Sequence, residues 1–371
     1  MQPKIVSFAS INIDEVYSIS HIVLPGETLS TSARQLNAGG KGTNASIAAA
    51  RAATTPVYVA GKIGNDGLWV RDIIQATGAN TTHITVDPQV STGRAIIQVD
   101  VKGENAIFLY PGANHRLTEQ DARNALAQCN EGDWLLLTNE TTAVVEAIMV
   151  AKERGMQVLW NPAPMDTDLV ARNEQIVSQV DVLVVNETEL ADLVALEQDV
   201  ENQQQKTSDV VQMARQAMRQ MKHCRVIAVT LGSRGSLCLV RRNRRNSHTI
   251  PVGTQDTKNN IDIASLEPST TVNEDIVEIQ MDCAPVDKDM VRDTTGAGDT
   301  WVGYFVAELA RAQGDSAESI SSTLVTLTPA MVTQAMRVAS YASGITVTRL
   351  GAVPSIPERR QVEEFLRTNK L

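Results

Sequence analysis

Short, continuous apolar runs alternate along this chain with segments whose apolar residues recur at helical spacing. Continuous apolar runs are typical of strands that are buried on both faces of a parallel sheet. The alternation therefore predicts an α/β fold with a doubly wound, mostly parallel sheet flanked by helices. The candidate strands are residues 5–9, 57–61, 134–138, 157–160, 182–185 and 226–230, and the candidate helices include residues 66–77, 119–128, 143–154 and 209–221.

Two segments break this alternation and predict a second, smaller sheet. Residues 16–36 and 93–110 have the pattern of antiparallel strands, and the second segment would be a hairpin that turns near Gly103 and Glu104. Together they could form a small sheet over the main one. We therefore expect a single domain over residues 1–371, with a β-sheet lid built from about residues 15–36 and 93–112.

The segment Asp293-Thr294-Thr295-Gly296-Ala297-Gly298-Asp299 carries the clearest chemical signal. It stands directly before an amphipathic run, residues 300–313, so its glycines would lie at a helix N-terminus. Unpaired backbone N–H groups and the helix dipole favour a bound anion there, such as phosphate. A carboxylate beside a phosphate repels it unless the carboxylate takes a proton from the hydroxyl that attacks phosphorus. We expect Asp299 to be this base, and the alternative is an Asp that caps an ordinary glycine-rich turn.

A second glycine-rich segment, Asn37-Ala38-Gly39-Gly40-Lys41-Gly42-Thr43-Asn44, opens a helix of small residues. Part of it fits the dinucleotide pattern G-x-G-x-x-A, but that pattern needs a buried strand directly upstream, and residues 31–37 are polar. A P-loop needs Ser or Thr after Gly-Lys, and Gly42 stands there instead. Neither of these phosphate motifs explains the segment.

The two glycine segments together resemble the ribokinase branch of the carbohydrate kinases, which also includes the bacterial minor phosphofructokinase. Further matching segments follow in order along almost the whole chain, and their number argues against chance agreement. The resemblance implies a β lid over a sugar, which suits a kinase because water must be kept from the activated phosphoryl group. The segments are Ser10-Ile11-Asn12-Ile13-Asp14, Tyr110-Pro111-Gly112-Ala113-Asn114, Asn139-Glu140-Thr141, Asn161-Pro162-Ala163-Pro164, Asn186-Glu187-Thr188-Glu189, Thr230-Leu231-Gly232-Ser233-Arg234-Gly235 and Thr348-Arg349-Leu350-Gly351-Ala352-Val353-Pro354-Ser355.

Polar residues that follow the carboxyl ends of strands are expected to bind the sugar, as in other open α/β sheets. Position alone also allows an Asx turn at Asn12 and Asp14, and a helix-start acid at Glu140. The backbone N–H groups of Gly296, Ala297 and Gly298 would form the anion hole for the developing charge. The sugar-binding set that the resemblance implies is Asn12, Asp14, Gly39, Gly40, Lys41, Asn44, Glu140 and Asp299.

The resemblance also implies an ATP site and two cation sites. Glu189 would bind Mg²⁺ through water, since this ion keeps most of its waters, and a helix cap at Asn186 can be present simultaneously. Potassium would lie beside the anion hole and hold the glycine segment in shape. The nucleotide would contact Asn186, Thr230, Gly232, Ser233, Gly235, Gly298 and Ser340, and the potassium loop would use Asp293, Thr295, Thr346, Arg349, Gly351 and Ser355.

Composition changes this picture only a little. The 371 residues carry a net charge of −10 with a pI near 5.1, which argues against nucleic acid and anionic membranes as partners. The basic run Arg241–Arg245 could be a nuclear address, although a solvated hairpin loop explains it as well. The four cysteines are far apart, which fits reduced thiols in the cytoplasm and implies no zinc site.

Residues 243–273 are rich in Asn, Asp, Thr and Ser and are expected to form an inserted surface loop, and residues 315–328 a second surface excursion. The resemblance leads us to expect ATP-dependent phosphorylation of the 5-hydroxyl of D-ribose by a homodimer that associates through the lid. The alternatives are another sugar or nucleoside kinase of the same fold, or a sugar or nucleotide sensor without catalysis.

Overall fold

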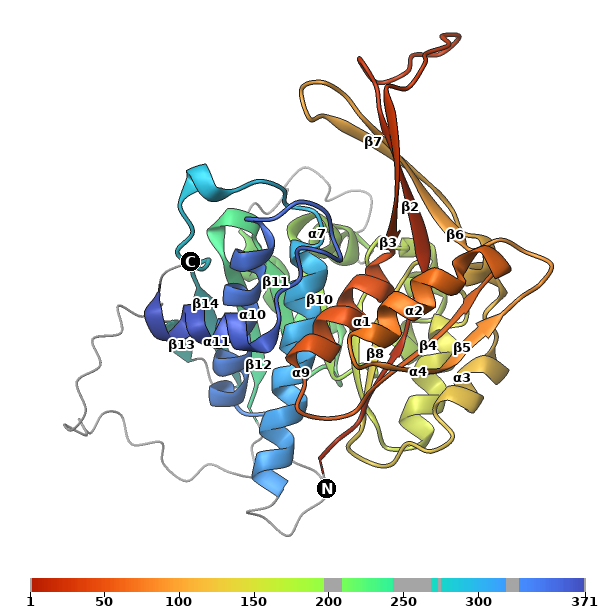
Figure 1. The fold of residues 1–371 in the computed structure, drawn as a ribbon. Helices are drawn as coiled ribbons and strands as arrows, with labels where there is room; N and C mark the ends of the chain where they lie inside the picture. The colour runs from red at the N-terminus through yellow and green to blue at the C-terminus, as the bar shows by residue number, and fades with distance from the viewer. Residues whose placement is uncertain (1, 197–208, 243–267, 273–274, 318–326, 370–371) are drawn as a thin grey trace.

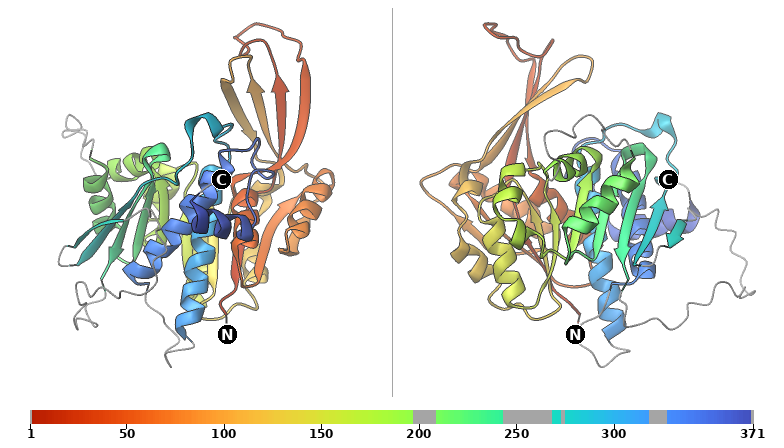
Figure 2. Two further views of the ribbon diagram at one scale, coloured as in Figure 1. Left: turned by 60° about the vertical axis from the view of Figure 1, so that its left-hand side comes forward. Right: turned by 180° about the vertical axis from the view of Figure 1, so that it is seen from behind.

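The computed structural model describes residues 2–196, 209–242, 268–272, 275–317 and 327–369, which form a large sheet between two layers of helices and a separate small sheet (Figure 1; Figure 2). Within these residues the large sheet has the strand order β13-β14-β12-β11-β10-β9-β8-β1-β4-β5. The strands from β11 to β5 pair in parallel, and β12, β14 and β13 extend the sheet antiparallel. Their bounds are β1 Ile5–Phe8, β4 Val57–Ile63, β5 Asn80–Val86, β8 Trp134–Thr138, β9 Gln157–Asn161, β10 Val182–Asn186, β11 Val226–Thr230, β12 Ser236–Arg241, β13 Ser269–Val272 and β14 Ile276–Met281.

Each face of the large sheet is covered by its own set of helices and its own hydrophobic core. One core joins the sheet to α1 (Lys41–Ala52), α2 (Leu68–Ala76), α9 (Ala297–Ala317), α10 (Pro329–Thr346) and α11 (Arg359–Thr368). The other face packs against α3 (Glu119–Ala125), α4 (Val144–Glu153), α5 (Thr167–Arg172), α6 (Glu174–Val177), α7 (Glu187–Ala195) and α8 (Val210–Gln220). No helix in the described part of the chain is long and apolar enough to span a membrane.

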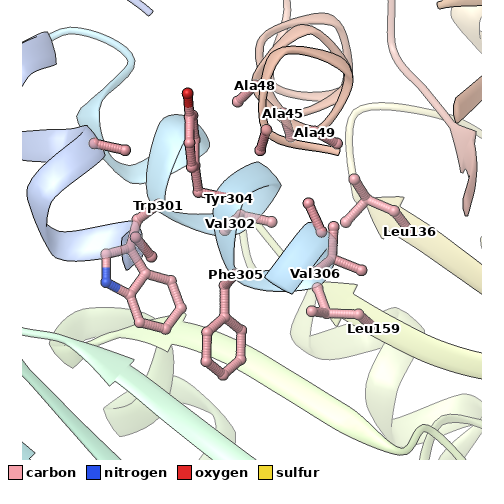
Figure 3. Close-up of a cluster of buried hydrophobic side chains, with 14 of the residues drawn as sticks. Ala45, Ala48, Ala49, Leu136, Leu159, Trp301, Val302, Tyr304, Phe305 and Val306 are labelled. Atoms are coloured by element: carbon pink, nitrogen blue, oxygen red, sulfur yellow. The ribbon is translucent and has the colours of Figure 1, made fainter. Parts of the chain in front are cut away.

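Helix α9 lies at the centre of the first helical layer, between α1 and α10. It approaches α1 very closely, because a Cβ on Gly303 would come within 2.4 Å of the Ala45 carbonyl oxygen and 2.5 Å of the Ala48 Cβ. Figure 3 shows the small side chains of α1 facing the aromatic and aliphatic residues of α9. The two helices both begin at the carboxyl edge of the sheet, so this contact fixes the two glycine segments relative to each other.

The small sheet, hereafter the lid, has the strand order β3-β2-β6-β7 and extends away from the core (Figure 2). Its bounds are β2 Asn12–Ser18, β3 Ala33–Gly39, β6 Gly93–Val99 and β7 Asn105–Tyr110. The hairpin at Gly103 is confirmed, since Gly103 N donates to the Asp100 carbonyl at 3.0 Å. The predicted antiparallel strands within each segment are confirmed, since β2 pairs with β3 and β6 with β7 in this way, whereas the two segments meet through a parallel pair, β2 and β6. Both strands leave the same edge of the core and run outward together.

The predicted α/β fold with a lid is confirmed, and so are all six candidate strands, to within two residues at either end. The prediction of a loop up to residue 273 is wrong at its end, because Ser269–Val272 forms edge strand β13 on β14. Its β-branched Thr-Thr-Val run favours a strand once a partner edge is available. Residues 243–267 lie outside the described residues.

The second expected excursion, residues 315–328, begins inside a helix instead. Helix α9 continues to Ala317, and Leu327 is buried just before α10 begins. This expectation is therefore wrong at both of its ends, and residues 318–326 are outside the described part of the chain. The strands β5, β12 and β14 were not among the candidates.

Candidate active site

The carboxyl edge of the large sheet brings the predicted sugar-binding residues together from four parts of the chain. Glu140, two residues after β8, accepts hydrogen bonds from the Ser10 hydroxyl at 2.7 Å and from the Lys41 backbone N–H at 2.9 Å. Ser10 in turn accepts from the Gly42 N–H at 2.9 Å. The Glu140 carboxylate therefore occupies the N-terminus of α1, where the helix dipole favours negative charge. Gly40 precedes this helix with φ of 92°, a conformation that glycine adopts readily.

Asn44 and Asp299 meet across the contact between α1 and α9. The Asn44 side-chain Nδ2 donates to Asp299 Oδ2 at 2.8 Å, although the two residues are 255 positions apart in the sequence. Asn44 Oδ1 is buried and has no hydrogen-bond partner among the described residues. One end of this amide thus orients the candidate base, and the other end is left to accept a hydrogen bond.

Asn12 begins the lid strand β2 and is held by a residue that was not predicted for the site. Asn114 Nδ2 donates to Asn12 Oδ1 at 2.7 Å, and Asn114 Oδ1 accepts from the Ile11 N–H at 2.9 Å. Asn114 is 1 % exposed. It stood in one of the matched sequence segments, as Ser10 did, but sequence position alone did not show that either residue orients a site residue.

Four carboxylates and one ammonium group interact electrostatically at this edge. Burial, together with the charges of Glu140 and Asp299, raises the pKa of Asp14 to about 7. Burial raises the pKa of Asp299, and the charge of Lys41 and the Asn44 amide act in the opposite direction. Burial likewise raises the pKa of Glu140 and of Glu189. A carboxylate with a raised pKa is a stronger base, which general-base catalysis at neutral pH requires.

Lys41 is the cation that these acids share. Its pKa is raised chiefly by Asp299, and further by Glu140 and Glu189, against the opposing effect of burial. No carboxylate of the described residues forms a salt bridge with its ammonium group. Lys41 therefore lies within electrostatic range of both the sugar-side acid Glu140 and the predicted magnesium-side acid Glu189.

The predicted anion hole lies at the beginning of a helix, as expected. Helix α9 starts at Ala297, and its first turn is closed by the Thr300 N–H, which donates to the Gly296 carbonyl at 2.8 Å. Ser343 of α10 donates to the Ala297 carbonyl at 2.8 Å and fixes this turn from outside. A Cβ on Gly298 would meet no atom within 4 Å, so the backbone is open to a ligand at that residue.

Asn186 and Glu189 form the cap that sequence analysis allowed. The Asn186 side chain accepts from the Glu189 N–H at 2.9 Å, and the Glu189 carboxylate accepts from the Asn186 N–H at 2.9 Å. This capping box starts α7. It uses one oxygen of each side chain, so each retains acceptor capacity at the carboxyl edge.

The predicted nucleotide loop follows β11 at the next position along the edge. Thr230 ends that strand, and the tight turn over Gly232–Arg234 is closed by the Leu231 N–H, which donates to the Gly235 carbonyl at 2.8 Å. Ser340 lies in α10 and is 6 % exposed. The exposed thiol of Cys283 donates to the Ser233 carbonyl oxygen at 3.3 Å, beside this loop.

The two segments predicted to bind potassium are joined in the structure. Asp293 Oδ1 accepts from the Thr295 N–H at 2.9 Å, and its Oδ2 accepts from the Gly351 N–H at 2.8 Å. Thr346 and Ser355 are fully buried. The Arg349 N–H donates to the Thr346 carbonyl at 3.1 Å and closes a turn there. The segment that follows α10 thus lies against the glycine segment, since a Cβ on Gly296 would come within 3.1 Å of the Ala352 Cα.

A network of charges joins the lid to the core, and it was not anticipated from the sequence. Arg94 of β6 contacts Asp66 of the core at 2.6 Å and forms an ion pair with Glu15 of β2, which Arg34 also contacts at 3.0 Å. The Tyr17 hydroxyl, followed by these arginines, lowers the pKa of Glu15 against the effect of burial. Charged residues on separate strands give no shared pattern in the sequence, so only the pairing of the strands reveals the network.

Comparison with known proteins agrees with this geometry. A model of the pfkB family of carbohydrate kinases matches residues 2–258 and 277–359, and the chain belongs to this family. It is 30 % identical over 370 residues to a ribokinase of Haemophilus influenzae, covering 99 % of each chain, and 27 % identical over 362 residues to a deoxyribokinase of Salmonella typhi, covering 96 % of this chain and 97 % of the relative. Among solved structures, the ribokinase of Cryptococcus neoformans in complex with ADP superimposes with a TM-score of 0.71 at 28 % identity, over 98 % of this chain and 99 % of that one.

Proposed function

We propose that this carbohydrate kinase transfers the γ-phosphoryl group of ATP to the 5-hydroxyl of D-ribose. The observation that carries the proposal is the contact between Asn44 and Asp299, which holds a half-buried carboxylate at the start of the glycine-capped helix α9. The family membership supports a kinase, and the relatives named ribokinase that match over nearly the whole chain support the sugar.

In this reaction Asp299 removes the proton of the attacking hydroxyl, and its raised pKa suits that role. The N–H groups of Gly296, Ala297 and Gly298 stabilise the charge that develops on the transferred group. The ammonium group of Lys41 neutralises charge between sugar and nucleotide. Phosphoryl transfer needs little more from the protein than such positioning and charge.

The sugar is proposed to bind between the lid and the sheet. Asn12, Asp14, Asn44 and Glu140 supply amide and carboxylate groups for its hydroxyls, and Gly39 and Gly40 allow the backbone to come close. A carboxylate that accepts a hydrogen bond from a hydroxyl, in a site shielded from water, makes a strong, charge-assisted hydrogen bond. The unpartnered Asn44 Oδ1 is suited to accept from another sugar hydroxyl, because a buried acceptor needs a donor from the ligand.

ATP is proposed to lie along the carboxyl edge, over Asn186, Thr230, Gly232, Ser233, Gly235 and Gly298, with Ser340 beside the base. Mg²⁺ would be bound through water by Glu189, whose remaining oxygen is available, and would offset the charge of the phosphates. Potassium would be held by the backbone of Asp293, Thr295, Thr346, Arg349 and Gly351 and by Ser355. The fit rests on the hydrogen bond from the Gly351 N–H to Asp293, which joins the two segments, and on the backbone carbonyl oxygens of these segments, which suit hard cations.

The competing function is phosphorylation of 2-deoxyribose, because deoxyribokinases are similar to this chain over nearly its full length. The test is a coupled ADP-release assay with ribose, 2-deoxyribose, fructose and adenosine under one set of conditions. Ribose should have the highest kcat/KM, because a pocket built to bind hydroxyls is left with unpaired groups by an analogue that lacks one. A higher value for 2-deoxyribose, fructose or adenosine would replace ribose as the substrate and leave the family unchanged.

The protein is further proposed to be a cytoplasmic homodimer that associates through the lid. The strand register puts Leu109 on the same face as Asp14, and Phe108 on the opposite face, 57 % exposed. This face does not serve the sugar, and besides the exposed Phe108 ring it carries the charged residues Glu15, Arg34 and Arg94. Aromatic and arginine side chains are enriched in protein interfaces, so this face suits a second copy of the chain. Light scattering should give twice the chain mass of 40.2 kDa, and Phe108→Glu should give the monomer mass, whereas Met149→Glu on α4 should not. A monomeric wild type would exclude this interface.

A further inference from the structure

Four neighbouring parallel strands each end in a polar residue, namely Thr138, Asn161, Asn186 and Thr230. The register pairs Thr138 with Asn161 and Asn186 with Thr230, and the pairing of Trp160 with Leu183 puts Asn161 two residues before the level of Asn186. The first pair thus lies one step deeper in the carboxyl edge of the sheet than the second. The proposed roles use Asn186 and Thr230. Thr138 and Asn161, hereafter the floor pair, have no role in them.

The floor pair lies beneath the first turns of α9. Side chains alternate along a strand, so the pair shares a face with Leu136 and Leu159, which lie two residues earlier and belong to the core under Val306 (Figure 3). Two strand residues advance ~6.6 Å, which equals about four residues of helix. Four residues before Val306 in α9 is Val302, which lies within one turn of Asp299. The floor pair is therefore level with the start of α9.

The floor pair has hydrogen-bonding capacity that the protein does not use. Thr138 is 1 % exposed, and its hydroxyl has no partner among the described residues. Asn161 is 7 % exposed, and its Nδ2 donates to the Val184 carbonyl at 2.8 Å, which fixes the orientation of the amide. This bond uses only the Nδ2 of Asn161 and does not involve its Oδ1. Buried polar groups are nearly always paired, so the unpaired Thr138 hydroxyl at a ligand edge indicates a water, an ion or a ligand.

The neighbours of the floor pair identify that ligand. Strand β9 lies between β8, which leads to Glu140, and β10, which leads to Glu189. Both of these acids raise the pKa of Lys41, so the Lys41 ammonium group lies within electrostatic range of each and the two acids face a common space. In the proposed function the sugar lies on one side of this space and the hydrated magnesium on the other. The phosphates and the waters of the metal would therefore stand directly above the floor pair.

We propose that Thr138 and Asn161 accept hydrogen bonds from the water shell of the magnesium–phosphate group, as positioning residues that fix the metal above the sheet. The inference rests on the proposed function, because it requires Mg·ATP at this edge. Magnesium keeps several of its waters when bound to protein, and each such water is a donor that needs an acceptor. Threonine and amide oxygens meet that need without adding negative charge beside Glu189.

The test is Thr138→Val, which keeps the shape of the side chain and removes only the hydroxyl. Binding of Mg·ATP without sugar, measured by titration calorimetry, should weaken by about tenfold or more, as when an outer-shell partner of a metal is lost. The Mg²⁺ concentration needed for half-maximal rate should rise similarly. Ribose binding should not change, and the apo variant should unfold at the wild-type temperature or above it, since an unpaired buried hydroxyl has been removed. Thr138→Ser should retain wild-type Mg·ATP binding.

The matched control is Thr55→Val, because the Thr55 hydroxyl is also buried and unpartnered but lies just before β4, at the opposite edge of the sheet. It should leave Mg·ATP binding unchanged. The inference would be overturned if Thr138→Val bound Mg·ATP as the wild type does, or if it lost ribose binding as much as Mg·ATP binding. Either result would leave the proposed function intact, provided that the wild-type protein phosphorylates ribose. Absence of that turnover in the wild type would instead reject the proposed function itself.

Discussion

Asp14→Asn should weaken sugar binding and, at neutral pH, make the empty protein more stable. Burial and the charges of Glu140 and Asp299 raise the pKa of Asp14 from 3.8 to about 7. Each pKa unit corresponds to 1.36 kcal/mol, so the ionised carboxylate destabilises the fold by about 4 kcal/mol well above pH 7. The asparagine amide keeps nearly the same shape but carries no charge, so this destabilisation disappears.

The sign of the pH dependence follows from the raised pKa. The protonated carboxyl is compatible with the fold, so the wild type loses nothing below the unfolded pKa of 3.8. Its stability falls as pH rises from about 4 to 7, because the unfolded chain releases this proton first. The difference between Asp14→Asn and the wild type should therefore be near zero at pH 4, grow to pH 7 and level off above it.

Thermal unfolding at several pH values measures this difference. A chain of 371 residues has an unfolding entropy of about 0.8 kcal/mol/K, so about 4 kcal/mol corresponds to ~5 °C. Asp289→Asn is the matched control, because Asp289 is exposed, and it should behave as the wild type. A difference that does not change with pH, or an Asp14→Asn protein less stable than the wild type at pH 8, would refute the electrostatic reasoning. The same variant should lose on the order of 2–4 kcal/mol of transition-state binding in kcat/KM for ribose.

Three other variants or conditions test the remaining parts of the site. Asp299→Asn should lower turnover by ~10²–10⁴-fold while ATP and ribose still bind in calorimetry, and near-normal turnover would remove Asp299 from the chemistry. Turnover should be low without potassium or sodium and rise when potassium is added. Turnover that does not change with potassium would reject the proposed cation site at Asp293 and Gly351 but not the kinase activity. Gly39→Ala should fold normally but raise the KM for ribose by roughly tenfold or more, because the new Cβ would lie 2.0 Å from Asp14 Oδ2 and displace that flexible carboxylate. An unchanged KM would show that Asp14 does not bind the sugar.

The sequence by itself determined the main sheet and the candidate chemistry. Strands such as Trp134–Thr138 and Val182–Asn186 are continuous apolar runs, and a buried parallel strand has few other compositions open to it. The glycine segment ending at Asp299 predicted a helix N-terminus because the helical spacing begins directly after it. These signals are local, so they can be recognised without knowing which strand or helix each segment packs against.

Only the tertiary structure decided which of these local pieces meet. The hydrogen bond from Asn44 to Asp299 depends on the close approach of α1 and α9 at Gly303, across 255 positions of sequence. The parallel pairing of β2 with β6, and the strand at residues 269–272, likewise depend on a neighbouring edge that the sequence does not name. Register and helix contact are set by packing of the whole core, because a strand or a helix stripe presents the same pattern to any partner that can bury it.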